Sequence, residues 1–184
     1  VAAGLMGVVI IFINSMVFYY PLEYTLMEIT DSLETDIKDA PDWFHSAISQ
    51  RPRKENLNHP LGNVAYQVWD RKDAQDIIIL IHGTGAHKQW WDPIAPLLCN
   101  KFSIIAPDLP GMGESDHRNA YNFEDFSDAL IAIFHQEKIV HGNQKVYLVG
   151  HSLGGHVAGF LASEFPDLFH GVVMIDSPIR PPTY

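Results

Sequence analysis

The sequence predicts an α/β fold in which a mostly parallel β-sheet is flanked by helices. Uninterrupted apolar runs at residues 77–81, 102–106, 146–149 and 172–175 are typical of strands buried on both faces, as in parallel sheets. Helical patterns separate these runs, and strands alternating with helices form parallel sheets through right-handed crossovers. Each run also ends in a loop rich in glycine, proline or polar residues, and such loops meet at the edge where open sheets bind ligands.

A β-hairpin is expected before the first apolar run. Residues 63–69 alternate between apolar and polar types (NVAYQVW), which predicts a half-exposed strand. The Pro-Leu-Gly-Asn stretch at 60–63 is typical of a turn, so residues 54–58 are expected to form the other arm.

Helices are expected at residues 42–48, 90–98, 122–139 and 152–165. The third has the clearest pattern, with apolar residues at helical spacing behind an asparagine that can cap the first turn, and Asp125 falls at the third helical position. A His-Gly-Asn stretch at 141–143 is expected to end this helix.

The N-terminal residues differ in character from the rest. Residues 1–20 form an apolar run long enough to cross a bilayer as a helix, which predicts a membrane-associated protein. Residues 21–40 contain six acidic residues against one lysine and are interpreted as an acidic linker. Met27 offers an alternative start, and a chain beginning there would lack the apolar run and be cytoplasmic.

Composition excludes several classes of function. The 184 residues carry a net charge of −10 and no basic stripe, so we expect no nucleic-acid partner. The single cysteine, Cys99, rules out an internal disulfide. No residues have the spacing of a metal site, and no cofactor is implied, so a small-molecule substrate is the expected partner; the oligomeric state stays open.

The segment GHSLGG at 150–155 places a serine between glycines at the end of an apolar run. Gly-x-Ser-x-Gly between a strand and a helix is a nucleophile elbow, a turn that projects the serine hydroxyl from the sheet. Ser152 is therefore the candidate nucleophile. Gly150 and Gly154 are expected to be required because side chains there would collide with neighbouring backbone.

A serine nucleophile also needs hydrogen-bond donors for the oxyanion that forms during attack. The backbone N–H of Leu153, at the start of the predicted helix, is one candidate. Thr84, in the HGTG loop after the first apolar run, is the second. A phosphate-binding loop is the competing interpretation, but residues 150–155 lack its Lys-Ser/Thr pair, and residues 111–113 lack the third glycine of a dinucleotide site.

These motifs resemble those of the α/β-hydrolase superfamily. HGTG at 82–85, DLPGMGES at 108–115 and GHSLGG at 150–155 are similar to its oxyanion loop, the loop after its fourth strand and its elbow. The resemblance covers residue 41 to the C-terminus, and the sequence looks like a bacterial subgroup of uncharacterised single-domain hydrolases. The motifs are highly specific for the fold but poorly specific for the substrate. Epoxide hydrolases and haloalkane dehalogenases carry aspartate at the nucleophile position, so Ser152 argues against both.

The resemblance also implies a catalytic acid and histidine after later strands, beyond Tyr184. His156 is expected beside the serine's turn and His170 at the opposite edge of the sheet, so neither is a credible base. Asp176 could be an acid placed after the sixth strand, as in some lipases. We therefore interpret the chain as an N-terminal fragment, with residues 41–184 an incomplete hydrolase domain truncated after the sixth strand. Expressed alone, it is expected to be insoluble or inactive.

The expected function is that of a serine hydrolase that forms an acyl-enzyme on Ser152 with an ester-like substrate. A carbon–carbon bond hydrolase and a non-catalytic small-ligand receptor or inactive member on the same fold remain alternatives. Among neighbouring residues, Trp90 and Trp91 are expected to pack the first helix on the sheet, although one could line an acyl pocket. Roles in bracing or orienting loops are expected for Asp108, Glu114, Ser115, His82 and His151.

Overall fold

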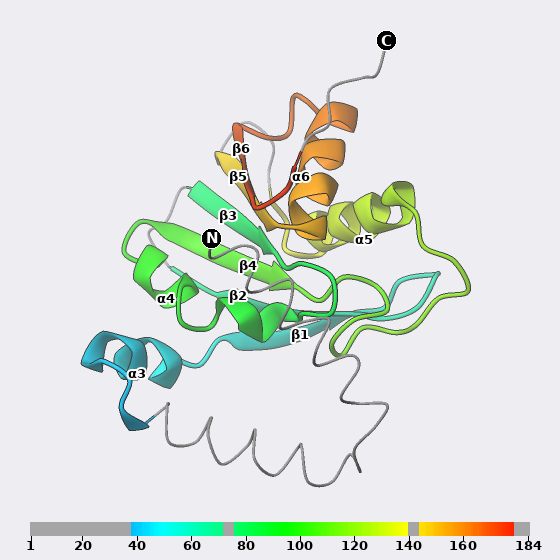
Figure 1. Ribbon diagram of the computed structural model, residues 1–184. Helices are drawn as coiled ribbons and strands as arrows, with labels where there is room; N and C mark the ends of the chain where they lie inside the picture. Colours follow the sequence, from blue (N-terminus) through cyan, green and yellow to red (C-terminus); the bar gives the residue numbers. More distant parts are fainter. Residues whose placement is uncertain (1–37, 72–75, 140–143, 179–184) are drawn as a thin grey trace, which may run out of the picture. The chain divides into compact units, whose positions relative to one another are not determined.

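The computed structural model describes residues 38–71, 76–139 and 144–178 (Figure 1). The chain divides into two compact units, residues 1–45 and 46–184, and helix α3 (Asp42–Ser49) begins in the first. Among the residues described, no helix is both long and apolar enough to span a bilayer. The predicted membrane helix at 1–20 and most of the acidic linker lie outside this part of the chain.

The second unit contains a six-stranded sheet with the order β1-β2-β4-β3-β5-β6. The neighbours β3, β4, β5 and β6 pair in parallel, whereas β1 pairs with β2 and β2 with β4 in antiparallel fashion. The strands are β1 (Arg53–Leu57), β2 (Val64–Trp69), β3 (Asp76–Ile81), β4 (Phe102–Pro107), β5 (Val146–His151) and β6 (Gly171–Ile175). The predicted hairpin and the four parallel strands are thus confirmed.

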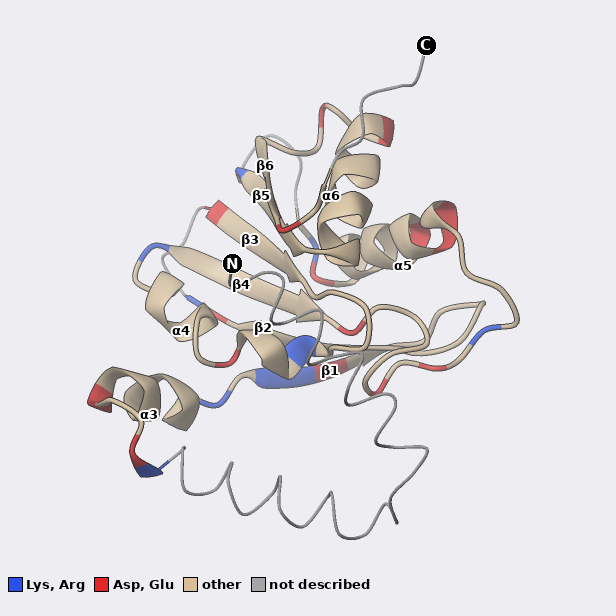
Figure 2. Cartoon of the chain, viewed as in Figure 1, with Lys and Arg blue, Asp and Glu red and all other residues tan. Residues whose placement is uncertain are grey.

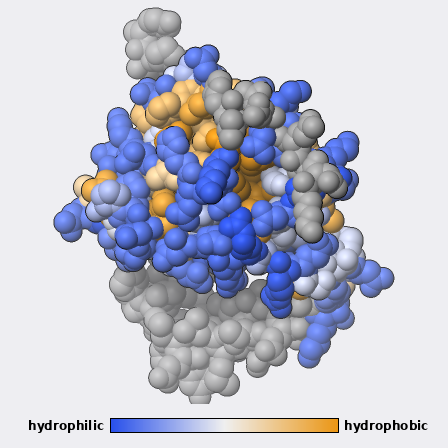
Figure 3. Space-filling model, turned by 180° about the vertical axis from the view of Figure 1, so that it is seen from behind, coloured by the Kyte–Doolittle hydropathy of each residue, from blue (hydrophilic) through white to orange (hydrophobic). Residues whose placement is uncertain are grey.

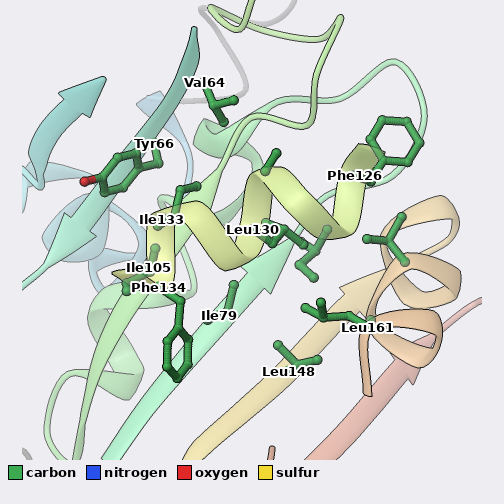
Figure 4. Packing of buried hydrophobic residues seen from close by; sticks show 14 of the residues in the cluster. Val64, Tyr66, Ile79, Ile105, Phe126, Leu130, Ile133, Phe134, Leu148 and Leu161 are labelled. Atoms are coloured by element: carbon green, nitrogen blue, oxygen red, sulfur yellow. The ribbon is translucent and has the colours of Figure 1, made fainter. Parts of the chain in front are cut away.

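Helices cover both faces of the sheet (Figure 1). On one face, α5 (Phe123–Gln136) and α6 (Leu153–Glu164) pack against odd-numbered residues of β3 such as Ile79 (Figure 4). On the other, the 3₁₀ turn η1 (Lys88–Trp91) and the short α4 (Ala95–Leu98) pack against even-numbered residues such as Leu80. Because β3 is covered on both faces, its continuous apolar sequence follows directly from its position.

Helix α5 begins as the sequence predicts. The Asn122 side chain accepts a hydrogen bond of 2.6 Å from the Asp125 N–H, so one of the free amides of the first turn is satisfied. Glu124 and Asp125 in that turn complement the helix dipole. Figure 2 shows acidic residues in red at the start of α5. The helix ends at Gln136, earlier than expected, and the chain turns through Lys138 at a φ of 53°. The 141–143 stretch lies outside the described residues.

Three predictions about individual elements are wrong. Strand β2 is buried along its whole length rather than half-exposed. The helix expected at 90–98 is divided between η1 and α4, because Pro93 lacks an N–H and cannot continue the helical ladder. Strand β6 is not buried on both faces as its apolar run predicts, but it does form the exposed apolar edge that truncation after the sixth strand implies, and Val173 is 54% exposed. The space-filling view in Figure 3 shows apolar residues at the surface among hydrophilic ones on this face of the molecule.

Candidate active site

Ser152 lies in a sharp bend between β5 and α6. Its backbone has φ 52° and ψ −116°, in the left-handed region that non-glycine residues rarely adopt. Its N–H donates to the Ile175 carbonyl at 2.8 Å, and its own carbonyl accepts from the Gly155 N–H at 3.0 Å. The predicted strand–turn–helix geometry of an elbow is therefore present, with strain of about 1–3 kcal/mol held by its surroundings.

The glycines on either side of Ser152 are required by close backbone approach. A Cβ on Gly150 would overlap the carbonyl of Gly154, and a Cβ on Gly154 would overlap the carbonyls of Ile81 and His82. The first turn of α6 therefore sits directly on the carboxyl ends of β5 and β3. The steric reason that the sequence predicted for both glycines holds.

A cavity of about 360 Å³ opens beside Ser152. It is formed by the loop at residues 83–87 together with Trp90, His151 and Ser152. The Trp90 ring stacks on the His151 ring with centroids 5.6 Å apart, and Trp90 remains 56% exposed. Trp91 is the buried tryptophan that packs on the sheet. The packing role expected for both tryptophans thus holds only for Trp91.

The loop after β3 lies against the serine. A Cβ on Gly83 would stand 3.1 Å from the Ser152 Cβ, so only a glycine leaves ordinary space there. Thr84 follows Gly83 and lines the cavity, while Leu153 is the first residue of α6, whose N–H has no acceptor within the helix. Of the two residues chosen as oxyanion donors, Leu153 directly follows Ser152 and Thr84 lines the same cavity as Ser152, and their role stays a prediction.

A buried ion pair joins the loop after β3 to the loop after β4. The Asp108 carboxylate, which is 0% exposed, accepts from the Lys88 Nζ at 2.6 Å and from the Lys88 N–H at 2.5 Å. It also accepts from the Glu114 N–H at 2.8 Å, and the Glu114 carboxylate contacts the same Nζ at 2.9 Å. The bracing role predicted for Asp108 and Glu114 is present in these contacts. Lys88 was not expected to take part.

The ion pair keeps its members charged. Burial lowers the pKa of Lys88, but hydrogen bonds and opposite charges from Asp108 and Glu114 outweigh burial, so this pKa is raised overall. The hydrogen bond and charge of Lys88 lower the pKa of Glu114. Lys88 and Glu114 are therefore both held in their charged forms at neutral pH.

His82 and Ser115 add two further ties between these loops. His82 Nδ1 lies 2.8 Å from the Gly83 carbonyl, and its Nε2 accepts from the Leu109 N–H at 3.0 Å. Burial lowers the pKa of His82, which favours the neutral ring with its proton on Nδ1. Ser115 Oγ donates to the Asp108 carbonyl and accepts from the Ala65 N–H. Both residues orient loops, as the sequence predicts.

The histidines that follow Ser152 lie where the sequence places them. His156 Nδ1 is 3.1 Å from the Ser152 carbonyl, and its Nε2 is 3.2 Å from the Pro178 carbonyl. His170 Nδ1 accepts from the Val146 N–H, at the far end of β5 from the serine. Asp176 follows β6 at a φ of 50°, beside the elbow strand. Among the residues described, no group of three acidic, histidine or cysteine side chains could hold a metal ion.

Comparisons with known proteins agree with this geometry. The chain is 30% identical over 120 residues to a serine hydrolase-like protein of Danio rerio, covering 64% of this chain and 36% of that one. It is 30% identical over 117 residues to the uncharacterized hydrolase YugF of Bacillus subtilis, covering 62% and 41%. The crystal structure of E-2-(acetamidomethylene)succinate hydrolase superposes with a TM-score of 0.61 at 25% identity, covering 70% of this chain and 46% of that one.

The chain thus spans less than half the length of these relatives. A family model described as the alpha/beta hydrolase fold matches residues 76–183, which include the loops at 82–85 and 108–115 and the elbow at 150–155. The protein belongs to the α/β-hydrolase family.

Proposed function

We propose that the protein is a serine hydrolase that cleaves an ester-like bond through an acyl-enzyme on Ser152. The observation that carries this proposal is the strained backbone of Ser152 in the lining of a cavity, directly before a helix N-terminus and against the glycine loop after β3. Strain beside a cavity is a mark of functional positions, and relatives named as hydrolases support the reaction class.

In the proposed reaction, Ser152 Oγ forms a bond to the substrate carbonyl carbon and its proton passes to a histidine base. The histidine then protonates the departing alkoxide as the ester C–O bond breaks. Water attacks the acyl carbon and gives its proton to the histidine, and the bond to Ser152 Oγ breaks as the histidine returns that proton to Oγ and the acid is released. We place that histidine and its acidic partner in residues following Tyr184. The N–H groups of Thr84 and Leu153 would stabilise the oxyanion, each lowering the barrier by about 2.7–4 kcal/mol.

A fluorophosphonate probe tests this proposal in the longer protein that carries these residues. The probe should label the wild type, and Ser152→Ala should abolish labelling. Ser163→Ala is the matched control, because Ser163 lies on the same helix and its exposed hydroxyl donates to the nearby Phe160 carbonyl. The 184-residue chain alone should not be labelled.

Two results would overturn the proposal. Labelling that persists in Ser152→Ala would place the nucleophile elsewhere. A folded wild type that is never labelled would favour the non-catalytic receptor. A third result would change only the substrate. If the protein is labelled and cleaves a carbon–carbon bond of a 1,3-diketone but no ester, Ser152 remains the proposed nucleophile and the protein is a carbon–carbon bond hydrolase.

A further inference from the structure

A second, largely apolar cavity of about 450 Å³ adjoins the elbow. Its walls come from residues 110–112 after β4, from His117 and Tyr121, from Phe126 in α5, and from Leu153. The cavity is open to solvent on one side, and its volume leaves room for a linear chain of about eight carbons along its apolar walls. The proposed reaction on Ser152 does not by itself require such a cavity.

The walls of this cavity are held by specific contacts. The Tyr121 ring stacks on Phe126, with centroids 6.1 Å apart, and Phe126 is packed on the core face of α5 (Figure 4). Tyr121 passes so close to Gly111 that a Cβ there would overlap its ring. The Tyr121 hydroxyl accepts from the Arg118 N–H at 2.9 Å. Contacts with Gly111, Arg118 and Phe126 therefore hold the Tyr121 ring in the wall of the cavity.

Leu153 connects this cavity to the proposed chemistry. Its side chain lines the apolar cavity, while its backbone N–H begins α6 directly after Ser152. A carbonyl oxygen accepting from that N–H would lie beside the Leu153 side chain. The group attached to the carbonyl carbon would then have a short path into the apolar space. The cavity at Ser152 is formed by a different set of residues, including His87 and His151.

We infer that the apolar cavity binds the acyl chain of the substrate, so that the protein prefers esters of medium-length linear fatty acids. The more polar cavity beside Trp90 would then take the alcohol portion, whose oxygen leaves with a proton. This inference rests on the proposed function, because it assigns the two cavities to the two halves of one ester.

The expected preference follows from apolar burial. Each buried methylene contributes about 0.8 kcal/mol, which is about fourfold in kcat/KM. From acetyl to octanoyl, six methylenes enter the cavity, and even half of the full effect gives a rise of about 60-fold. Beyond the length that fills the cavity, the rise should stop.

The test measures kcat/KM of the longer protein on p-nitrophenyl esters from acetyl to dodecanoyl. Met112→Trp fills the cavity and should reduce the ratio of kcat/KM for the octanoyl ester to kcat/KM for the acetyl ester at least tenfold. If this variant does not fold, Met112→Phe is used in its place. Ile131→Trp is the matched control, because Ile131 lines a separate groove between α5 and α6, and the ratio should not change. A ratio near one in the wild type, or equal ratios in the Met112 and Ile131 variants, would overturn the inference.

A binding measurement separates this inference from the proposed function. Ser152→Ala should bind octanoate, and adding Met112→Trp should weaken that binding at least tenfold. If esters are cleaved at Ser152 without chain-length preference, the function stands and the acyl-chain assignment is wrong. If no ester is cleaved and no probe reacts, the proposed function is wrong. In that case, octanoate binding that is weakened by Met112→Trp would still identify the apolar cavity as a fatty-acid site. Octanoate binding unaffected by Met112→Trp contradicts the assignment.

Discussion

Replacing Lys88 by methionine should destabilise the protein strongly. The Lys88 side chain is 2% exposed and its Nζ lies 2.6 Å from an Asp108 carboxylate that is 0% exposed. Methionine preserves most of the buried volume but leaves the carboxylate without its counter-charge. Removing one partner of a buried pair costs about 3–5 kcal/mol, and we expect Lys88→Met to reduce the free energy of unfolding by that amount.

The double variant Lys88→Met/Asp108→Asn distinguishes an unpaired charge from lost packing. The asparagine oxygen can still accept from the N–H groups of residues 88 and 114, whose backbones are unchanged. Because no buried charge remains, the double variant should recover about 2 kcal/mol relative to Lys88→Met alone. The recovery, added to the cost of Asp108→Asn measured alone, gives the coupling energy of a double-mutant cycle, which is about 0.5–3 kcal/mol for contacting residues.

Urea unfolding of the longer protein, followed by circular dichroism, gives these free energies from the midpoint and slope. Glu114→Gln is the control, because the Glu114 side chain is 63% exposed and surface pairs contribute less than about 1 kcal/mol. If Lys88→Met costs no more than Glu114→Gln, or if the double variant is as unstable as the sum of its single variants, the reasoning from buried charge is wrong.

Two further predictions follow from the elbow and from His82. Gly154→Ala should prevent folding or lower the melting temperature by more than about 5 °C, because its Cβ would overlap two carbonyls. Gly159→Ala is the control and should be tolerated, because its Cβ would lie 3.5 Å from Met174 Sδ. The unfolding free energy should fall as pH drops below 6.5, because burial lowers the pKa of His82 and the unfolded chain then binds more protons. His82→Gln should reduce this slope between pH 7 and 5; an unchanged slope would contradict it.

The sheet and the elbow could be predicted because their signals are local. The four apolar runs fall on β3 to β6, and the bend at Ser152 is encoded by glycines two residues away on each side. Steric exclusion between backbone atoms acts at short range in the sequence. A pattern of a few residues is therefore enough to predict it.

The contacts between loops could not be predicted in the same way. Gln67 occupies a polar position in an alternating strand, yet it is buried because its amide donates to the Lys88 carbonyl and to Asp92. Lys88 follows a glycine loop, and its sequence context predicts an exposed residue. It is buried because the fold brings it beside Asp108, which is 20 residues away in the sequence. Such pairs depend on which loops the sheet brings together, and no local pattern records that.

Contacts with β6 and the residues after it help to hold the backbone conformation of Ser152. Ser152 donates its N–H to Ile175, and Ser177 Oγ donates to the Ser152 carbonyl at 2.8 Å. The unusual torsion angles of the serine are therefore maintained jointly by its own helix and by the neighbouring strand. Any molecule that drew residues 175–177 away from the elbow would remove two of the contacts that hold the Ser152 backbone in this conformation, without occupying either cavity.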